Sequence, residues 1–195
     1  MMSSTSRLEP IPPEQLTPEQ RRLYDDILSH LGESLDDKNS FVTRNEEQAF
    51  VGPWNGWLHA PVVGAGVWTL IKAMAQDEKL PQNLRQIAIL TVGSHFNAAY
   101  EIYAHTALAR QSFDEDQIRA LTNGAIPQGF SPEETLVHQI AKALVRGGPL
   151  SDELWAEGVR VLGQDEAIRL VFLVGLYALV SMCLNGFNVP VPAEA

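Results

Sequence analysis

Apolar residues recur at intervals of three or four positions through most of this chain. That spacing places them on one face of an α-helix, and the alternation typical of a half-buried strand is missing. The pattern therefore predicts an all-α protein of about seven or eight helices. The expected helices lie within residues 17–32, 61–76, 80–96, 97–110, 114–124, 131–148, 151–163 and 164–184.

Two of these helices carry clear start signals. Thr17 is a good N-cap residue, and the glutamine three positions later completes a capping box. Ser131 and Glu134 repeat the pattern, with a proline at the first helical position. We expect residues 1–16, which are rich in proline and serine, to form an extended segment before a single helical domain at 17–195.

Three segments differ from the amphipathic pattern. Residues 33–52 are expected to form a long loop. The segment GPWNGWLHAP, residues 52–61, combines glycines, prolines and tryptophans, which favours turns that bury the aromatic rings. The most apolar stretch, residues 170–184, is shorter than the ~20 residues that span a bilayer. We interpret it as a helix buried on most sides, either in the core or against another subunit.

Composition and charge limit the kinds of partner that the protein can have. The chain has 195 residues and a net charge of −10, without a cluster of lysines or arginines, which argues against a nucleic-acid partner. With Cys183 as the only cysteine, neither an intramolecular disulfide nor a CxxC motif can form. The first residues lack the apolar core of a signal peptide. We therefore expect a cytoplasmic protein with no membrane partner.

The segment NAAYEIYAHTALAR, residues 97–110, places Glu101 and His105 one helical turn apart. A carboxylate so placed can orient an imidazole and favour its protonated, proton-donating form. An exposed pair worth ~0.3–0.5 kcal/mol is the alternative, and spacing alone favours it. A metal site of His59, His95 and His105 would need tertiary convergence, because no HExxH spacing is present.

Other polar residues lie among apolar neighbours. Asn55 and His59 flank tryptophans, which suits either a pocket wall or a structural turn. Arg85 suits either a carboxylate anchor or an ordinary ion-paired residue. Tyr177 and Asn185 are polar points in the apolar C-terminal segment, and Asn185 also suits a helix C-cap. Sequence spacing leaves each pair of alternatives open.

The segment LRQIAILTVGSHFNAAYEIYAHTALAR, residues 84–110, resembles the core motif of the carboxymuconolactone decarboxylase family of the AhpD-like superfamily. The resemblance extends to GPWNGWLHAP and to LYALVSMCLNGFNVPVP, and so covers about residues 50–192. It implies an AhpD-like all-helical domain that assembles into homo-trimers or homo-hexamers through long apolar helices. It also implies active sites near the subunit interfaces.

The resemblance also carries functional expectations. Aligned on His105, the CxxC of the peroxidase branch would fall on Ala98 and Glu101, so a thiol peroxidase is not expected. The decarboxylase branch keeps Glu and His, which implies a lyase without metal or cofactor acting on a small cyclic or lactone carboxylate. Decarboxylation is the leading case. In that reaction, His105 donates the proton and Glu101 orients the imidazole of His105. Many relatives have a glutamate at the position of Gln86, and a glutamine cannot act as a base there.

The same acid–base pair would also suit an isomerase, dehydratase or cyclase, and the fold would suit a non-catalytic oligomer that binds small molecules. The residues expected to bind the substrate are Trp54, Asn55, Trp57, His59, Arg85, His95, Tyr177 and Asn185.

Overall fold

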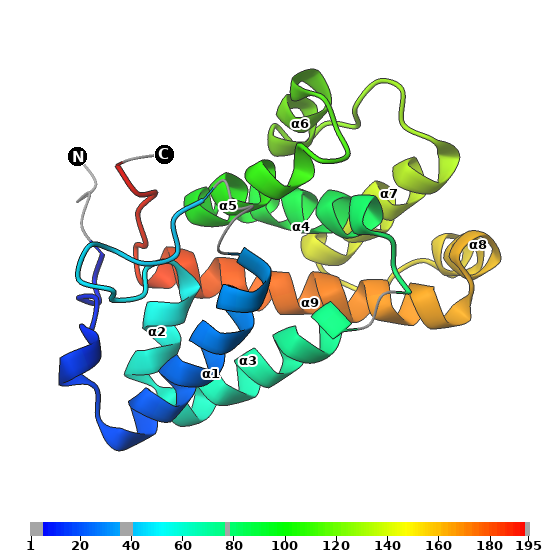
Figure 1. Ribbon diagram of the computed structural model, residues 1–195. Helices are drawn as coiled ribbons and strands as arrows, with labels where there is room; N and C mark the ends of the chain where they lie inside the picture. Colours follow the sequence, from blue (N-terminus) through cyan, green and yellow to red (C-terminus); the bar gives the residue numbers. More distant parts are fainter. Residues whose placement is uncertain (1–5, 36–40, 77–78, 194–195) are drawn as a thin grey trace.

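The computed structural model describes residues 6–35, 41–76 and 79–193, and helices dominate it (Figure 1). The all-α class is therefore confirmed. Within these residues the only other elements are a 3-10 turn at Pro13–Gln15 and an isolated β-bridge between Arg44 and Phe50. The helices are α1 (Pro18–Leu35), α2 (Pro53–His59), α3 (Pro61–Gln76), α4 (Gln82–Phe96), α5 (Ala99–Ala109), α6 (Glu115–Thr122), α7 (Pro132–Arg146), α8 (Asp152–Leu162) and α9 (Gln164–Gly186).

Helix α9 forms the axis of the fold (Figure 1). It packs against α4, α7 and α8 on one side and against α2 and α3 on the other. One core cluster gathers around α4, α7 and the first half of α9, and a second gathers around α1–α3 and its second half. The cavity described below lies where the second cluster meets α4 and α5.

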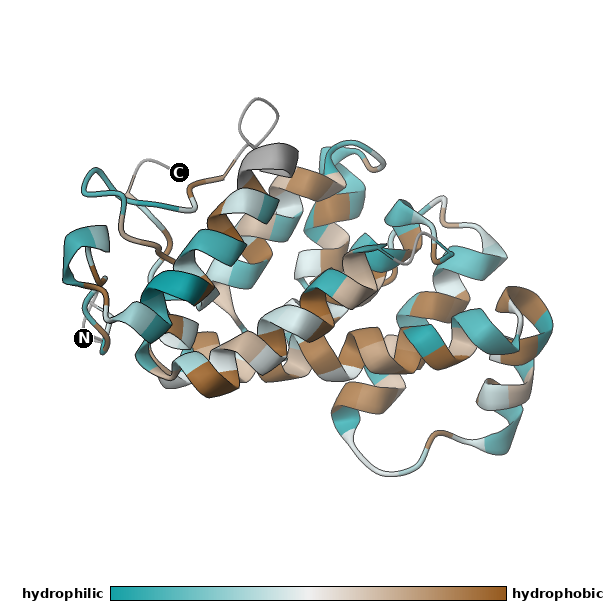
Figure 2. Cartoon of the chain, turned by 60° about the horizontal axis from the view of Figure 1, so that its bottom comes forward, coloured by the Kyte–Doolittle hydropathy of each residue, from teal (hydrophilic) through white to brown (hydrophobic). Residues whose placement is uncertain are grey.

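Helix α9 is longer than the apolar stretch that predicted it, with 23 residues. In the described part of the chain it is the one helix long and apolar enough to cross a membrane, a test that core helices also pass. One stripe of the helix is not covered by the described part of the chain, since Phe172 and Met182 are 60% and 58% exposed, and its burial against another subunit stays a prediction. Figure 2 shows hydrophobic residues along much of this helix. The cytoplasmic location stays a prediction.

Both predicted capping boxes form. The backbone N–H of Thr17 donates to Gln20 Oε1 at 2.9 Å, and that of Ser131 donates to Glu134 Oε2 at 2.9 Å. Between α4 and α5, Asn97 adopts a left-handed conformation (φ 50°) that turns the chain sharply. This turn lays α5 against α4 and brings side chains of the two helices together.

The expected turns at residues 52–61 are wrong, because this segment forms α2 and the start of α3. Glycine is needed there for close packing. A Cβ on Gly52, at φ +66°, would lie 2.4 Å from the Tyr100 ring, and one on Gly64 would lie 2.4 Å from the Trp57 carbonyl oxygen. The glycines thus let α2 pack closely against α3 and let its N-terminal end approach Tyr100.

Helix α3 leaves large apolar side chains exposed. Val63 and Leu70 are 68% and 41% exposed. Gly64 and Trp68 are the buried residues of this helix. The neighbouring helices α1 and α2 decide which side is covered, and the apolar pattern of α3 runs around most of its surface.

Candidate active site

Glu101 and His105 occupy the buried side of α5 and face α4. His105 Nε2 lies 3.2 Å from Glu101 Oε1, and His105 Nδ1 lies 2.9 Å from Oε1 of Gln86 on α4. The side chains of Glu101 and His105 are only 4% and 13% exposed. Burial of this depth rules out the alternative of a solvent-exposed helix-surface pair.

The contact with Gln86 determines the tautomer of His105. An amide oxygen only accepts hydrogen bonds, so Nδ1 of His105 donates its proton to Gln86. The other ring nitrogen, Nε2, then carries a lone pair directed at Glu101. Oε1 of Glu101 has no donor among the described residues. Without a proton between them, Oε1 of Glu101 and Nε2 of His105 would be two acceptors facing each other. A proton on Glu101 removes this conflict, because a carboxylic acid can donate to Nε2.

Burial favours the same distribution of protons. Desolvation raises the pKa of Glu101 to about 8. Desolvation, assisted by the positive charge of Arg85, lowers the pKa of His105 to about 3. The expectation that the pair keeps the imidazole protonated is therefore wrong. At neutral pH the proton therefore lies on the carboxyl group of Glu101, and the imidazole of His105 is neutral.

The pair lines a cavity of about 240 Å³ between α1, α2, α3, α5 and α9. Three residues predicted to bind substrate, Trp54, Trp57 and Tyr177, line the same cavity. The Tyr177 ring packs edge-on against the His105 imidazole, with centroids 5.1 Å apart, and so restrains its orientation. The structure thus brings together five of the residues chosen from the sequence.

Arg85 does not line this cavity, although it lies close enough for its charge to lower the pKa of His105. It precedes Gln86 on α4 and is half-buried. Its role at the site is electrostatic, and the predicted contact with a substrate carboxylate stays a prediction.

The structure places four other predicted residues outside the cavity. Asn55 Nδ2 donates to the carbonyl oxygens of Leu8 and Glu9, at 3.1 and 3.3 Å, and His59 Nε2 lies 2.9 Å from the Glu9 carbonyl oxygen. Both side chains therefore hold the N-terminal segment against α2. The reason is helical geometry, because Asn55 and His59 share a side of α2 that Trp54 and Trp57 do not.

His95 and Asn185 each contact Phe96, the last residue of α4. His95 is exposed and packs edge-on against Phe96, with ring centroids 5.0 Å apart. Asn185 Nδ2 donates to the Phe96 carbonyl oxygen at 2.6 Å. His59, His95 and His105 consequently do not converge, and the described residues contain no group of three or more His, Cys, Asp or Glu suited to a metal.

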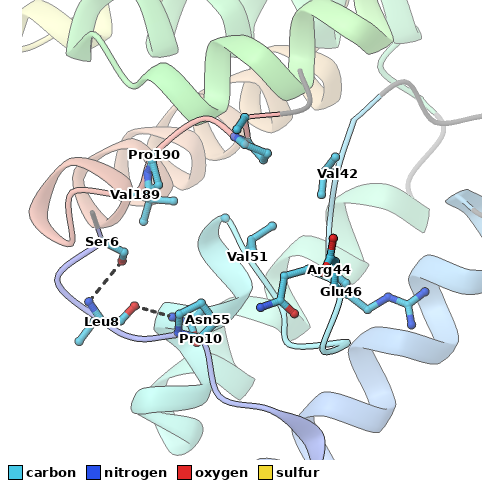
Figure 3. Close-up of a pocket in the computed structure, with 14 residues that line it drawn as sticks. Ser6, Leu8, Pro10, Val42, Arg44, Glu46, Val51, Asn55, Val189 and Pro190 are labelled. Atoms are coloured by element: carbon cyan, nitrogen blue, oxygen red, sulfur yellow. Dashed lines mark hydrogen bonds between the residues drawn. The ribbon is translucent and has the colours of Figure 1, made fainter. Parts of the chain in front are cut away.

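A second cavity, of about 330 Å³, lies on the other side of α2 (Figure 3). The N-terminal segment, the loop around Val42 and Val51, and the C-terminal tail enclose it. Asn55 lines this second cavity. Its described charged lining residues are Arg44 and Glu46, and it contains no buried acid–base pair.

Trp68 and Tyr100 also line the cavity, and Gln86 contacts His105, although none of these three residues was predicted to form the site. Gln86 carried a usable signal. It is a polar residue within the buried stripe of a helix, and a buried amide needs a hydrogen-bond partner. Trp68 and Tyr100 carried no such signal, because buried aromatic residues are ordinary in a helical core.

The sequence matches no protein-family model and no curated protein. Several solved structures share its fold, among them the following two. One is a variant of the debrominase Bmp8 in complex with 2,3,4-tribromopyrrole, with a TM-score of 0.70 and 15% identity over 98% of this chain and 94% of the other. The second is the alkylhydroperoxidase AhpD core of an uncharacterized peroxidase-related protein from Ralstonia eutropha JMP134, with a TM-score of 0.68 and 15% identity over 97% and 93%.

The chain has an AhpD-like fold. This confirms the fold that the resemblance implied. Membership of the carboxymuconolactone decarboxylase family stays a prediction, because identities of 15% establish the fold alone. The chemistry of this chain therefore has to be argued from its own side chains.

Proposed function

We propose that this AhpD-like protein is an acid–base enzyme that transfers protons on a small ring compound. One observation carries the proposal. The cavity contains a carboxyl group whose pKa is raised and an imidazole whose pKa is lowered, 3.2 Å apart. Paired groups whose environments push their pKa values in opposite directions are typical of acid–base sites.

The pair supports a balanced proton cycle. Glu101 donates its proton to one atom of the substrate, while His105 Nε2 removes a proton from another atom. The substrate is then isomerised, and the site holds a carboxylate beside an imidazolium. Transfer of one proton from His105 to Glu101 over 3.2 Å restores the starting state. Isomerisation, or a dehydration or cyclisation that uses the same two transfers, follows most directly from this geometry.

Decarboxylation of a lactone carboxylate stays a second candidate. The apolar cavity would weaken hydration of a carboxylate and so favour loss of CO2, after which Glu101 would protonate the carbon left behind. Holding the carboxylate needs a cation, and the described lining residues include neither lysine nor arginine. Cys183 lies outside the cavity lining, and burial raises the pKa of its thiol, so thiol peroxidation has no support here.

We also propose that the protein forms a homo-oligomer through the exposed stripe of α9. Five large apolar residues there recur at helical spacing and are at least 38% exposed, which is typical of a surface covered by another subunit. They are Ile168, Val171, Phe172, Leu179 and Met182. The choice between trimer and hexamer stays a prediction from the resemblance.

The proton-transfer proposal can be tested with α-angelica lactone. Its double bond migrates when one ring carbon loses a proton and another gains one, and NMR in D2O follows both events. We expect catalysis by the wild-type protein and loss of at least ~100-fold in Glu101→Gln and His105→Ala. His95→Ala, at an exposed position outside the cavity, is the control. Wild-type rates in either active-site variant would refute the assignment.

A further inference from the structure

The wall of the Glu101–His105 cavity is mainly aromatic. Its aromatic residues come from four helices and from the loop before α2. Trp54 packs against Tyr100, Trp57 against Trp68, and Tyr177 against the His105 imidazole, at tilted or perpendicular angles. Such a wall favours flat molecules, which can contact ring faces and edges over most of their surface. The six rings belong to Phe41, Trp54, Trp57, Trp68, Tyr100 and Tyr177.

The charge of the wall is as informative as its shape. Apart from tyrosines, its titratable residues in the described part of the chain are His30, Glu101 and His105. Glu101 is protonated and His105 is neutral at pH 7, and the described lining contains no lysine or arginine. A carboxylate that entered this cavity would lose its hydration without direct contact with a lysine or arginine of the described lining, since Arg85 acts on His105 from outside that lining, and this loss is costly. An uncharged molecule avoids that cost.

Two buried hydrogen-bond donors add a requirement. The indole N–H groups of Trp57 and Trp68 have no acceptor within the described residues. The two rings lie together, with centroids 6.1 Å apart and planes inclined by 35°, and both line the cavity. Buried donors without partners are rare in folded proteins. An oxygen atom on a bound molecule that reaches these N–H groups would satisfy them, and a carbonyl oxygen can accept two hydrogen bonds.

We propose that this cavity binds an uncharged, flat ring compound whose carbonyl oxygen accepts hydrogen bonds from Trp57 and Trp68. A lactone or a conjugated cyclic ketone has this chemistry, whereas a ring carboxylate does not. A cavity of about 150 Å³ holds one benzene ring, so about 240 Å³ suits one or two fused rings. The inference rests on the proposed function in one respect, which is that the bound ring is the substrate on which Glu101 and His105 act.

The test compares coumarin, an uncharged bicyclic lactone, with the anion of coumarin-3-carboxylic acid by isothermal titration calorimetry at pH 7. We expect the wild-type protein to bind coumarin at least tenfold more tightly than the anion. Equal affinities, tighter binding of the anion, or failure of both compounds to bind would each overturn the inference.

Two variants test the indole donors. Trp57→Phe and Trp68→Phe keep an aromatic ring and remove the N–H, and we expect each to weaken coumarin binding about tenfold. Trp155→Phe, on α8 and outside the cavity, is the matched control. Circular dichroism checks that each variant folds, and one folded variant of the two is enough to test whether an indole donor contributes to binding. Wild-type affinity in a folded Trp57→Phe or Trp68→Phe protein would overturn the role of that donor.

The experiments separate this inference from the proposed function. Coumarin binding without any isomerisation of α-angelica lactone would refute the proton-transfer proposal and leave the ligand class intact. Isomerisation of the lactone by a protein that binds the anion of coumarin-3-carboxylic acid more tightly than coumarin would refute the ligand class and leave the proton-transfer proposal intact.

Discussion

Replacing Glu101 by glutamine is expected to make the protein more stable while it removes the acid. A glutamine has nearly the size of the protonated carboxyl group, and its amide can donate to His105 Nε2 in the same position. It also stays uncharged at every pH. The variant therefore keeps the packing of the wild-type site and removes only the ability to ionise.

The size of the effect follows from the shifted pKa. The carboxyl pKa is about 8 in the folded protein against an ordinary value of 4.5, so between these pH values the unfolded chain releases a proton that the folded protein retains. Wild-type stability falls through this window by about 1.4 kcal/mol per pH unit. At pH 7, Glu101→Gln should exceed the wild type by an amount on the order of 3 kcal/mol, and near pH 4.5 the difference should vanish.

Urea unfolding at pH 4.5, 6 and 7 measures this difference directly. Glu133→Gln, at an exposed position of α7, controls for the loss of one negative charge. A difference that does not grow between pH 4.5 and pH 7 would show that Glu101 is ionised in the folded protein. That result would also remove the basis for assigning Glu101 as the acid.

Three further predictions concern single positions. Gln86→Leu leaves Nδ1 of His105 without its acceptor, so we expect a loss of about 1–3 kcal/mol in urea unfolding and slower lactone isomerisation. His138 is fully buried without a hydrogen-bond partner among the described residues, and burial, with the nearby Lys142, lowers its pKa to about 4. Below pH 6.5 the unfolded chain therefore binds a proton at His138 that the folded protein does not bind, so wild-type stability falls as the pH is lowered. His138→Leu should reduce this loss of stability between pH 6.5 and pH 5 by about 2 kcal/mol. Phe172→Glu should yield a smaller particle in light scattering, and an unchanged mass would refute the α9 interface.

Local sequence determined most of the secondary structure. Capping boxes and helical periodicity act over a few residues, which is why the starts at Thr17 and Ser131 and the all-α class could be predicted. The spacing of Glu101 and His105 also sufficed to place them on one side of one helix.

The sequence did not determine which neighbour covers each helix face. Asn55 and Trp54 are adjacent in the chain, yet α2 directs them into two different cavities. His95 illustrates the same limit, because it lies ten residues from His105 and outside the cavity. Side-chain direction depends on how helices pack, and that packing sums many weak contacts from distant parts of the chain.

The tertiary structure also decided the chemistry of the pair. From spacing, the carboxylate was expected to keep His105 protonated, as it would in water. Packing of α4, α5 and α9 instead removes the solvent that stabilises both charges, and the proton moves to Glu101. The sequence thus placed an acid and a base side by side, and burial determined which of them holds the proton.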